Sequence, residues 1–241
     1  MKIQYVSDVH TEFHKDLGIQ WAKTIPVEGD VLVLAGDIVI FENLIQVLTI
    51  ICNRFSKVVF VSGNHEYYRS DRKTIHNKLQ KIANKFDNFH HLNNNVVVIE
   101  DIRFVGTTLW WSAPPYAWLA IMNGLNDFSQ ILGYRKWVSQ ANIKAKQFLQ
   151  ENVREGDIVI THHAPTWEAH RRRQLGNGVM HFAYYNNLDD LILDNKPKYW
   201  IYGHTHHEDQ FSIGDTLLVN SPHDYCPYEG GWPKKFGLLD V

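Results

Sequence analysis

Residues 30–37, with the sequence Asp-Val-Leu-Val-Leu-Ala-Gly-Asp, contain the segment that decides the fold class of this chain. A near-continuous apolar run of this length predicts a strand that is buried on both faces, as in a parallel sheet, and the Gly-Asp pair ends it. Similar runs occur at 3–6 and 57–61, and the apolar spacing of 42–54 predicts a helix between the second and third strands. This alternation predicts an α/β fold.

The rest of the chain continues this pattern and then changes to consecutive strands. Helical patterns occur at 70–86, 141–152 and 184–193, and strand-like runs occur at 96–99, 103–105, 157–161 and 199–202. Three short runs near the end predict a closing antiparallel set, at 211–213, 217–219 and 236–241. We therefore expect a layered α/β domain whose sheets are packed on each other and flanked by helices.

One stretch interrupts the pattern. Residues 109–137 are crowded with aromatic side chains, contain two consecutive prolines and show no clean period. We interpret them as an insertion that folds over one side of a single domain spanning residues 1–241, since this length is ordinary for one α/β domain.

Composition makes some partners less probable than others. The formal net charge is −2, so the bulk charge gives no reason to expect nucleic acid or an anionic membrane as a partner. No apolar run reaches the roughly 18 residues that a membrane helix needs, and the first residues predict a strand rather than a signal peptide. Cys52 and Cys226 lie far apart in no metal-ligand spacing, which predicts two reduced thiols. We expect a cytoplasmic protein without a membrane partner.

Histidine is the informative residue type, with 14 copies. Half of them fall in four short clusters directly after strand-like runs. Five strand ends carry candidate ligands: Asp8 and His10; Asp37; Asn64 and His65; His162; His204 and His206. Because ligands bind outside the carboxyl ends of strands in α/β sheets, we expect these side chains to meet if their strands are neighbours. In an extended backbone, residues two apart also point to the same side, so each Asp-x-His or His-x-His pair would act together.

These donors are carboxylates, imidazoles and one carboxamide, without a thiolate. The set suits divalent ions such as Mn, Fe, Zn, Co or Ni and argues against a structural zinc knot. It also exceeds what one four-coordinate ion can use, so we expect two ions that share a carboxylate. The alternative is that the Asp and Asn residues cap turns, which they often do, but turn chemistry does not call for histidine at four strand ends.

The chain resembles the calcineurin-like metallophosphoesterase superfamily in the type and order of five blocks: Asp8-Val9-His10, Gly36-Asp37, Gly63-Asn64-His65-Glu66, His162 and Gly203-His204-Thr205-His206. The resemblance implies a fold of two packed mixed β-sheets flanked by helices, which is a four-layer sandwich. It also implies a dinuclear hydrolase of phosphate mono- or diesters. It implies that one ion is bound by Asp8, His10 and His206, that the other is bound by Asn64, His162 and His204, and that Asp37 bridges them. Mn is the ion most expected, with Fe, Ni, Zn or Co as alternatives, and a metal-bridging hydroxide would attack phosphorus.

The resemblance implies a separate role for His65. In the family, the histidine after the ligand asparagine donates a proton to the leaving oxygen, so we expect His65 and the bridging Asp37 to be catalytic. Many members carry an acidic residue three positions after the Gly-Asp pair, and this residue orients the histidine. Here that position is Ile40. Either a backbone carbonyl orients His65 instead, or His65 matters less, as it would for esters with activated leaving groups.

Two further groups are candidates for substrate binding. Arg171 and Arg172, followed by Arg173, lie in a predicted loop after the His162 strand and could hold a substrate phosphate, with a solvated charge run as the alternative. Trp111 belongs to an aromatic group that could stack on a base or an aromatic leaving group, or could anchor the insertion as a small core.

The sequence favours an enzyme that hydrolyses a small phosphate ester. Two alternatives stay open: a non-catalytic metal-binding scaffold for protein partners, and a metal-dependent nuclease. The nuclease would need a local basic groove, because the net charge gives it no support. The short chain and its single candidate cap favour an open site for a small-molecule substrate, and these features leave the oligomeric state open.

Overall fold

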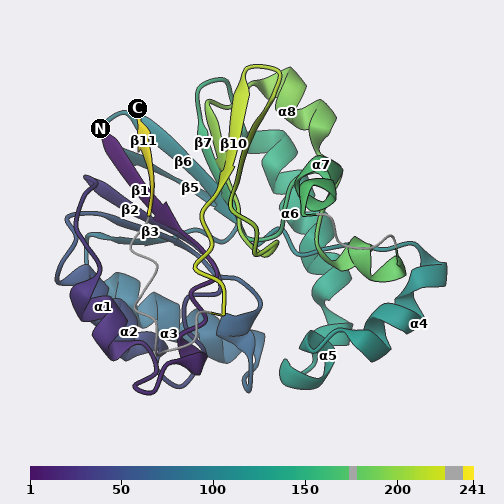
Figure 1. Ribbon diagram of the computed structural model, residues 1–241, viewed down its shortest axis with the longest axis horizontal. Coiled ribbons are helices and arrows are strands. Elements are labelled where there is room, and N and C mark those ends of the chain that lie inside the picture. Colours follow the sequence, from purple (N-terminus) through teal and green to yellow (C-terminus); the bar gives the residue numbers. More distant parts are fainter. Residues whose placement is uncertain (174–177, 226–235) are drawn as a thin grey trace.

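The predicted strands pair into two sheets, which pack against each other and carry helices on both outer faces (Figure 1). The computed structural model describes residues 1–173, 178–225 and 236–241, so Cys226 lies outside the described residues. Cys52 is a free, buried thiol. Within the described ranges, no helix is both long enough and apolar enough to cross a membrane. The predicted α/β architecture of two mixed sheets flanked by helices is confirmed.

The first sheet has the strand order β11-β1-β2-β3-β4, and its neighbours are parallel except β11, which runs antiparallel to β1. Its strands are β1 (Lys2–Val6), β2 (Val31–Ala35), β3 (Val58–Val61), β4 (Phe89–His91) and β11 (Gly237–Asp240). The second sheet has the order β5-β6-β7-β8-β10-β9, with parallel pairs from β6 to β10 and an antiparallel strand at each edge. Its strands are β5 (Asn95–Ile99), β6 (Ile102–Thr107), β7 (Ile158–Thr161), β8 (Tyr199–Ile201), β9 (Asp209–Ile213) and β10 (Thr216–Asn220).

Helices form the two outer layers (Figure 1). The first sheet is covered by α1 (Ile19–Thr24), α2 (Leu44–Cys52) and α3 (Arg72–Lys85). The second sheet is flanked by α6 (Val138–Asn152), α7 (Trp167–Arg172) and α8 (Asp189–Asn195), while α4 (Pro115–Gly124) and α5 (Asp127–Gln130) project below them. Short 3₁₀ helices complete the loops: η1 (Thr11–Phe13), η2 (His65–Tyr67), η3 (Tyr134–Lys136) and η4 (Val179–Ala183).

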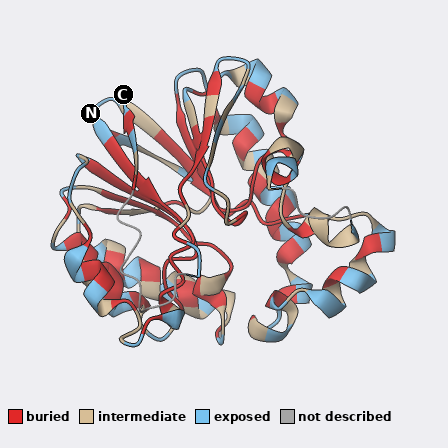
Figure 2. Ribbon diagram, viewed as in Figure 1, coloured by how far each residue is buried: buried red, intermediate tan, exposed pale blue. Residues whose placement is uncertain are grey.

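The alternation of side chains along each strand explains the continuous apolar runs. In β2, Leu32 and Leu34 belong to the core under the helices, whereas Val31, Val33 and Ala35 belong to the core between the two sheets. Strand β7 of the second sheet divides its side chains between two cores in the same way. Figure 2 shows the central strands as buried along most of their length. A strand with a core on each face needs an apolar residue at every position.

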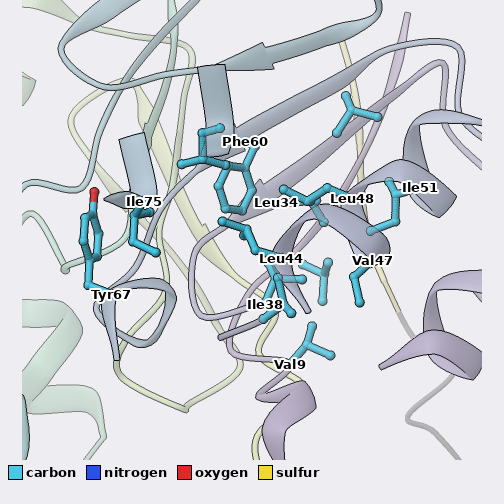
Figure 3. Packing of buried hydrophobic residues seen from close by; sticks show 14 of the residues in the cluster. Val9, Leu34, Ile38, Leu44, Val47, Leu48, Ile51, Phe60, Tyr67 and Ile75 are labelled. Carbon is cyan, nitrogen blue, oxygen red and sulfur yellow. The ribbon is translucent and has the colours of Figure 1, made fainter. Parts of the chain in front are cut away.

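Figure 3 shows the core between the first sheet and its helices. Leu34 of β2 and Phe60 of β3 pack in one cluster with Leu44, Leu48 and Ile51 of α2, and all five side chains are fully buried. The three helix residues recur at the spacing that predicted the helix. Burial of this apolar stripe attaches α2 to the sheet.

The later strands are arranged differently from the predicted closing antiparallel set. Strands β9 and β10 do pair antiparallel, but β10 also pairs parallel with β8, and β11 pairs with β1 in the first sheet. Helix α8 begins at Asp189 rather than near residue 184. Elements α1, α7 and β4 were not predicted, because they are short and a short segment carries too little periodicity to be recognised.

Residues 109–137 form α4, α5 and η3, and their aromatic side chains continue the core under the first sheet. Trp110, Trp111 and Tyr134 are buried, and Trp111 Nε1 donates a hydrogen bond to Tyr134 OH at 2.8 Å. The Trp110 ring lies 5.0 Å from that of Trp137. The suggested stacking wall is therefore corrected for Trp111, because a fully buried ring has no face left for a ligand. The alternative of an aromatic core that anchors the insertion holds instead.

Exchange of Leu34 for alanine should lower the free energy of unfolding by about 2–5 kcal/mol, because a buried side chain is lost and a cavity remains. Urea denaturation measures the change. The matched control is Leu119→Ala on α4, where the parent side chain is 68% exposed and the change should stay within about 0.5 kcal/mol. Equal changes in the two variants would contradict the assignment of β2 to two cores.

Candidate metal centre

The loops that follow β1, β2, β3, β7 and β8 meet at one end of the two sheets, and backbone hydrogen bonds connect them. His10 N donates to Asp37 O at 2.9 Å, which links the loops of two neighbouring strands in the first sheet. Gly203 N donates to His162 O at 2.9 Å, which links the corresponding loops of the second sheet. The candidate ligands therefore lie on turns that are held in place by backbone hydrogen bonds between loops.

Five of the predicted ligands have left-handed backbone conformations. The φ angle is 51° at Asp8, 48° at His10, 54° at Asp37, 66° at His204 and 50° at His206. Non-glycine residues adopt this region at a cost on the order of 1 kcal/mol each, and such residues cluster at functional sites. The expectation that the Asp-x-His and His-x-His pairs lie on extended backbone was wrong. Tight turns, and not strand alternation, direct these side chains.

The first group of donors consists of Asp8, His10, Asp37 and His206, whose ligand atoms lie within 4.8 Å of one another. His206 Nε2 lies 3.4 Å from Asp8 Oδ1 and 3.0 Å from His10 Nε2. His10 Nε2 lies 3.9 Å from Asp37 Oδ2. These are the residues that the resemblance implies for one ion together with the bridge.

The second group of donors consists of Asp37, His162 and His204, again within 4.8 Å of one another. His162 Nε2 lies 3.3 Å from Asp37 Oδ2 and 3.1 Å from Asn64 Oδ1, so the carboxamide belongs to the same group. Asp37 is 1% exposed and takes part in both groups. Its carboxylate is therefore the feature that two neighbouring ions would share.

Each of the four imidazoles uses one ring nitrogen for an oxygen outside the two groups. The partners are Ala35 O for His162 Nδ1 (2.9 Å), Ala183 O for His204 Nε2 (3.1 Å), Asp224 Oδ1 for His206 Nδ1 (2.8 Å) and Glu12 Oε1 for His10 Nδ1 (3.2 Å). An imidazole that donates through one nitrogen presents the lone pair of the other nitrogen, which is how histidine binds metal ions. These acceptors thus assign the tautomers and aim the free nitrogens at the donor groups.

The donor set fits divalent ions. With both Nδ1 atoms donating, His10 and His206 direct two Nε2 lone pairs at each other across 3.0 Å. His162 Nε2 likewise faces the acceptor oxygens of Asn64 and Asp37. Facing acceptors repel one another unless positive charge lies between them. A proton on His162 can provide such charge: burial opposes ionisation of Asp37, but the protonated imidazole of His162 outweighs it and holds the pKa of the Asp37 carboxyl well below its usual range.

Two glycines leave room for the Asp37 carboxylate and its neighbours. A Cβ atom on Gly63 would overlap Asp37 Oδ1, and a Cβ atom on Gly36 would overlap His162 Nδ1. Gly36 also has a φ of 88°, a conformation that glycine adopts without strain. Steric space around Asp37 and His162 therefore explains why glycine occupies these positions of the Gly-Asp and Gly-Asn-His blocks.

Glu66 holds the backbone around Asp37, a role that the sequence did not reveal. Its carboxylate accepts hydrogen bonds from the backbone N–H groups of Asp37 (3.1 Å), Ile38 (2.7 Å), Val39 (3.2 Å) and Gly63 (2.6 Å). Glu66 is fully buried, and burial, with the nearby Asp37 charge, raises its pKa. Glu66 stands inside a recognised block, but the 3₁₀ turn η2 sets its direction, and that turn is not visible in the local pattern.

Asp127 orients the carboxamide of Asn64 and was also missed. Asn64 Nδ2 donates to Asp127 Oδ1 at 2.9 Å, which turns Asn64 Oδ1 towards His162. Tyr68 OH donates to the same Asp127 oxygen at 2.9 Å. Asp127 is fully buried, which raises its pKa. It lies on α5 in the insertion, 63 residues from Asn64, so no local signal connects the two.

His65 lies beside the first group, with Nε2 3.9 Å from Asp37 Oδ2. Its Nδ1 lies 2.5 Å from Glu12 Oε1, the same oxygen that accepts from His10. Burial alone would lower the pKa of His65, but the Asp37 and Glu12 carboxylates outweigh it and raise that pKa to about 9. The acidic neighbour that is missing at Ile40 is thus provided by Glu12, which the sequence analysis did not single out.

A cavity of about 500 Å³ opens over the donor groups. Its lining includes Asp37, Asn64, His65, His204 and His206. One wall comes from the insertion, with Gly124, Leu125, Asn126, Asp127 and Gln130 among its lining residues. The candidate metal centre is therefore accessible to a ligand, and the insertion limits the space beside it.

The two predicted substrate arginines lie outside this cavity. Arg171 pairs with Glu168 at 2.6 Å, and Arg172 pairs with Asp209 at 2.7 Å. The predicted loop is in fact helix α7, which ends at Arg172, so consecutive arginines point in different directions around the helix. Arg173, the next residue, is the one of the three that lines the cavity.

The sequence profile of the calcineurin-like phosphoesterase family matches residues 1–208 of this chain. The matched region contains all seven candidate ligands and His65. The chain therefore belongs to the calcineurin-like phosphoesterase family.

Two similar proteins cover nearly the whole chain. An uncharacterized protein of Acanthamoeba polyphaga mimivirus is 26% identical over 258 residues, which cover 92% of this chain and 91% of that protein. The crystal structure of a phosphopantetheinyl hydrolase from Mycobacterium tuberculosis is similar with a TM-score of 0.75 and 14% identity, over 94% of this chain and 90% of that one. At this identity the structural similarity shows a shared fold and does not extend to the substrate.

Exchange of Glu66 for alanine should lower the free energy of unfolding by roughly 3 kcal/mol, because four backbone N–H groups in a buried turn lose their acceptor. Urea denaturation of chelator-treated protein measures this without a contribution from bound ions. The control is Glu155→Ala, at an exposed position, with a change within about 0.5 kcal/mol. A Glu66→Ala variant as stable as its parent would show that the turn does not depend on this carboxylate.

Proposed function

We propose that this protein is a metal-dependent phosphoesterase that uses two divalent ions to hydrolyse a small phosphate mono- or diester. One observation carries the proposal: two donor groups share Asp37 and open onto a cavity that also contains His65, an imidazole suited to proton transfer. Membership of the calcineurin-like phosphoesterase family supports the phosphoester chemistry.

The two donor groups assign the residues that would hold the ions. One ion would be held by Asp8, His10 and His206, the other by Asn64, His162 and His204, with Asp37 between them. Oxygen and imidazole donors fit Mn, which is the ion proposed, and also fit Fe, Ni, Zn and Co. Bound ions of this kind make water more acidic and neutralise charge on phosphoryl oxygens.

His65 is the proposed general acid. Its Nδ1 is committed to Glu12, so the proton available to a leaving oxygen is held at Nε2, which lies 3.9 Å from Asp37 Oδ2. The His65 side chain is 12% exposed and lines the cavity, so it can reach a bound ester with little contact to bulk water. Poor leaving groups need this proton, whereas activated aryl leaving groups need it much less.

Arg173 is the proposed contact for a substrate phosphate. It lines the cavity, and its guanidinium lies 5.5 Å from the ring centroid of Tyr184. Its Nη1 is buried and has no hydrogen-bond partner within the described part of the chain. A buried guanidinium nitrogen without a partner favours an anionic ligand, and arginine matches phosphate geometry well.

The cavity supports a small substrate. A space of about 500 Å³ lies in the range of small-molecule sites. Because the insertion forms one wall and reaches Asn64 through Asp127, we include residues 109–137 in one catalytic domain that spans residues 1–241. In this arrangement the insertion restricts the size of the ester.

Mn-loaded protein should bind about two ions per chain and hydrolyse a p-nitrophenyl phosphate mono- or diester, and Asp37→Asn should lower turnover at least about 100-fold because both ions lose a ligand. The measurements are metal content by mass spectrometry and turnover of a panel of esters with Mn, Fe, Ni, Zn and Co. Two bound ions without turnover of any ester would favour the scaffold alternative. Faster turnover of oligonucleotides than of small esters would favour the nuclease.

Arg173→Ala should lower kcat/KM about 10- to 100-fold without changing the metal content, because one charge-assisted contact to the phosphate is lost. Arg171→Ala is the matched control, since its parent side chain is exposed and paired with Glu168, and it should change kcat/KM less than about twofold. Equal effects of the two substitutions on kcat/KM would contradict the assignment of Arg173 as a contact for the substrate phosphate.

A further inference from the structure

We propose that Glu12 is a positioning residue that holds His65 in line with the metal centre, an inference that rests on the phosphoesterase function proposed above. Glu12 lies on η1, two residues after the candidate ligand His10. Its side chain is only 13% exposed. A carboxylate this far from bulk water acts mainly on the groups that it contacts, and its two hydrogen-bond partners among the described residues are imidazoles.

A single oxygen of Glu12 serves both rings. Glu12 Oε1 lies 2.5 Å from His65 Nδ1 and 3.2 Å from His10 Nδ1. Each ring that donates through Nδ1 must direct its Nε2 to the opposite side. The two Nε2 atoms lie at the same distance, 3.9 Å, from Asp37 Oδ2. Glu12 thereby sets the direction of a candidate metal ligand and of the general acid relative to one shared carboxylate.

Other contacts restrict the main chain and the ring plane of His65, but they do not determine which edge of the ring faces the metal centre. The ring of Tyr68 stacks on that of His65, with centroids 4.0 Å apart and planes 24° apart. Stacking holds the plane of the imidazole, but it does not distinguish one edge from the other. The backbone N–H of His65 donates to Asp37 Oδ1 at 2.8 Å and so holds the main chain. Orientation within the plane needs an acceptor at Nδ1, which Glu12 provides.

Among the described residues, the other polar atom at His65 Nδ1 is His10 Nδ1, at 3.2 Å, and that nitrogen is itself paired with Glu12 Oε1. Ile40 lines the same cavity and has no side-chain polar atom. Asp127 accepts from Asn64 and Tyr68 through Oδ1, and its Oδ2 has no hydrogen-bond partner among the described residues, so it does not accept from the His65 ring. No backbone carbonyl is among the hydrogen-bond partners of the His65 ring within the described residues, so the carbonyl alternative considered from the sequence does not apply there.

The expected signature of the proposal is a dependence on the leaving group. Glu12→Ala should lower turnover of esters with poor, alkyl leaving groups about 10- to 100-fold, because a misdirected acid loses part of the 10²–10⁴-fold that such catalysis provides. Turnover of p-nitrophenyl esters should fall less than about threefold, because this leaving group departs without a proton. Glu12→Gln, which keeps a neutral acceptor oxygen, should fall between the parent and Glu12→Ala.

A double-variant cycle tests whether Glu12 acts through His65. In a His65→Asn background, Glu12→Ala should have no further effect on the alkyl ester, since coupled residues are non-additive. Because Glu12→Ala also removes the partner of His10, turnover is measured at saturating metal, where metal content should stay at the parent level in every variant. Glu155→Gln, at an exposed position, serves as the matched charge control. Equal losses on both esters, together with loss of bound metal, would overturn the proposal, because Glu12 would then act through His10 alone.

A spectroscopic measurement separates this inference from the proposed function. Long-range ¹H–¹⁵N spectra of the Zn-loaded protein should show a His65 ring protonated at Nδ1, identified by its absence in His65→Asn, and Glu12→Ala should abolish that signal pattern. If the parent protein turns over no ester at all, the phosphoesterase function fails and these spectra still decide the Glu12 contact. An unchanged His65 spectrum in Glu12→Ala would overturn the inference even if the enzyme is active.

Discussion

The Asp37 carboxylate is the constraint on which the rest of the site depends. It is almost fully buried, and burial of a carboxylate is costly unless positive charge or hydrogen-bond donors surround it. The backbone N–H of His65 and the imidazole of His162 provide such groups, and they keep the pKa of Asp37 low. Gly63 leaves the space that its oxygen occupies. Glu66 then holds the backbone turn that carries it.

Neither sheet contains a complete donor set. The loops of β1, β2 and β3 carry Asp8, His10, Asp37 and Asn64, whereas those of β7 and β8 carry the three other histidines, His162, His204 and His206. The donor groups therefore form only when the two sheets pack with their carboxyl ends together. The apolar core between the sheets, which contains residues such as Val33 and Ile160, stabilises that packing by burial. The packing of the two sheets therefore determines the geometry of the donor groups.

The residues around the donors determine how the donor side chains are oriented. Glu12, Asp224 and two backbone carbonyls determine which nitrogen of each imidazole faces the centre. Asp127 does the same for the carboxamide of Asn64, and it connects the site to the aromatic insertion. Oriented ligands of this kind bind metal ions better than ligands that must first be ordered. The insertion therefore has two functions in the structure, as part of the core and as a wall of the cavity.

The sequence by itself determined the α/β fold class and the positions of the candidate ligands, because a strand with a core on each face must be apolar throughout and the polar residues that end it stand out. It did not determine the left-handed turns at residues such as Asp37 and His204, nor the burial of Trp111, nor the choice of Arg173 over its neighbours. It also did not reveal Glu12 or Asp127. Periodicity records which face of an element is buried, whereas the direction of a side chain and its partner 53 or 63 residues away depend on how the elements pack. The tertiary structure alone decides those contacts, since they form between segments that share no local pattern.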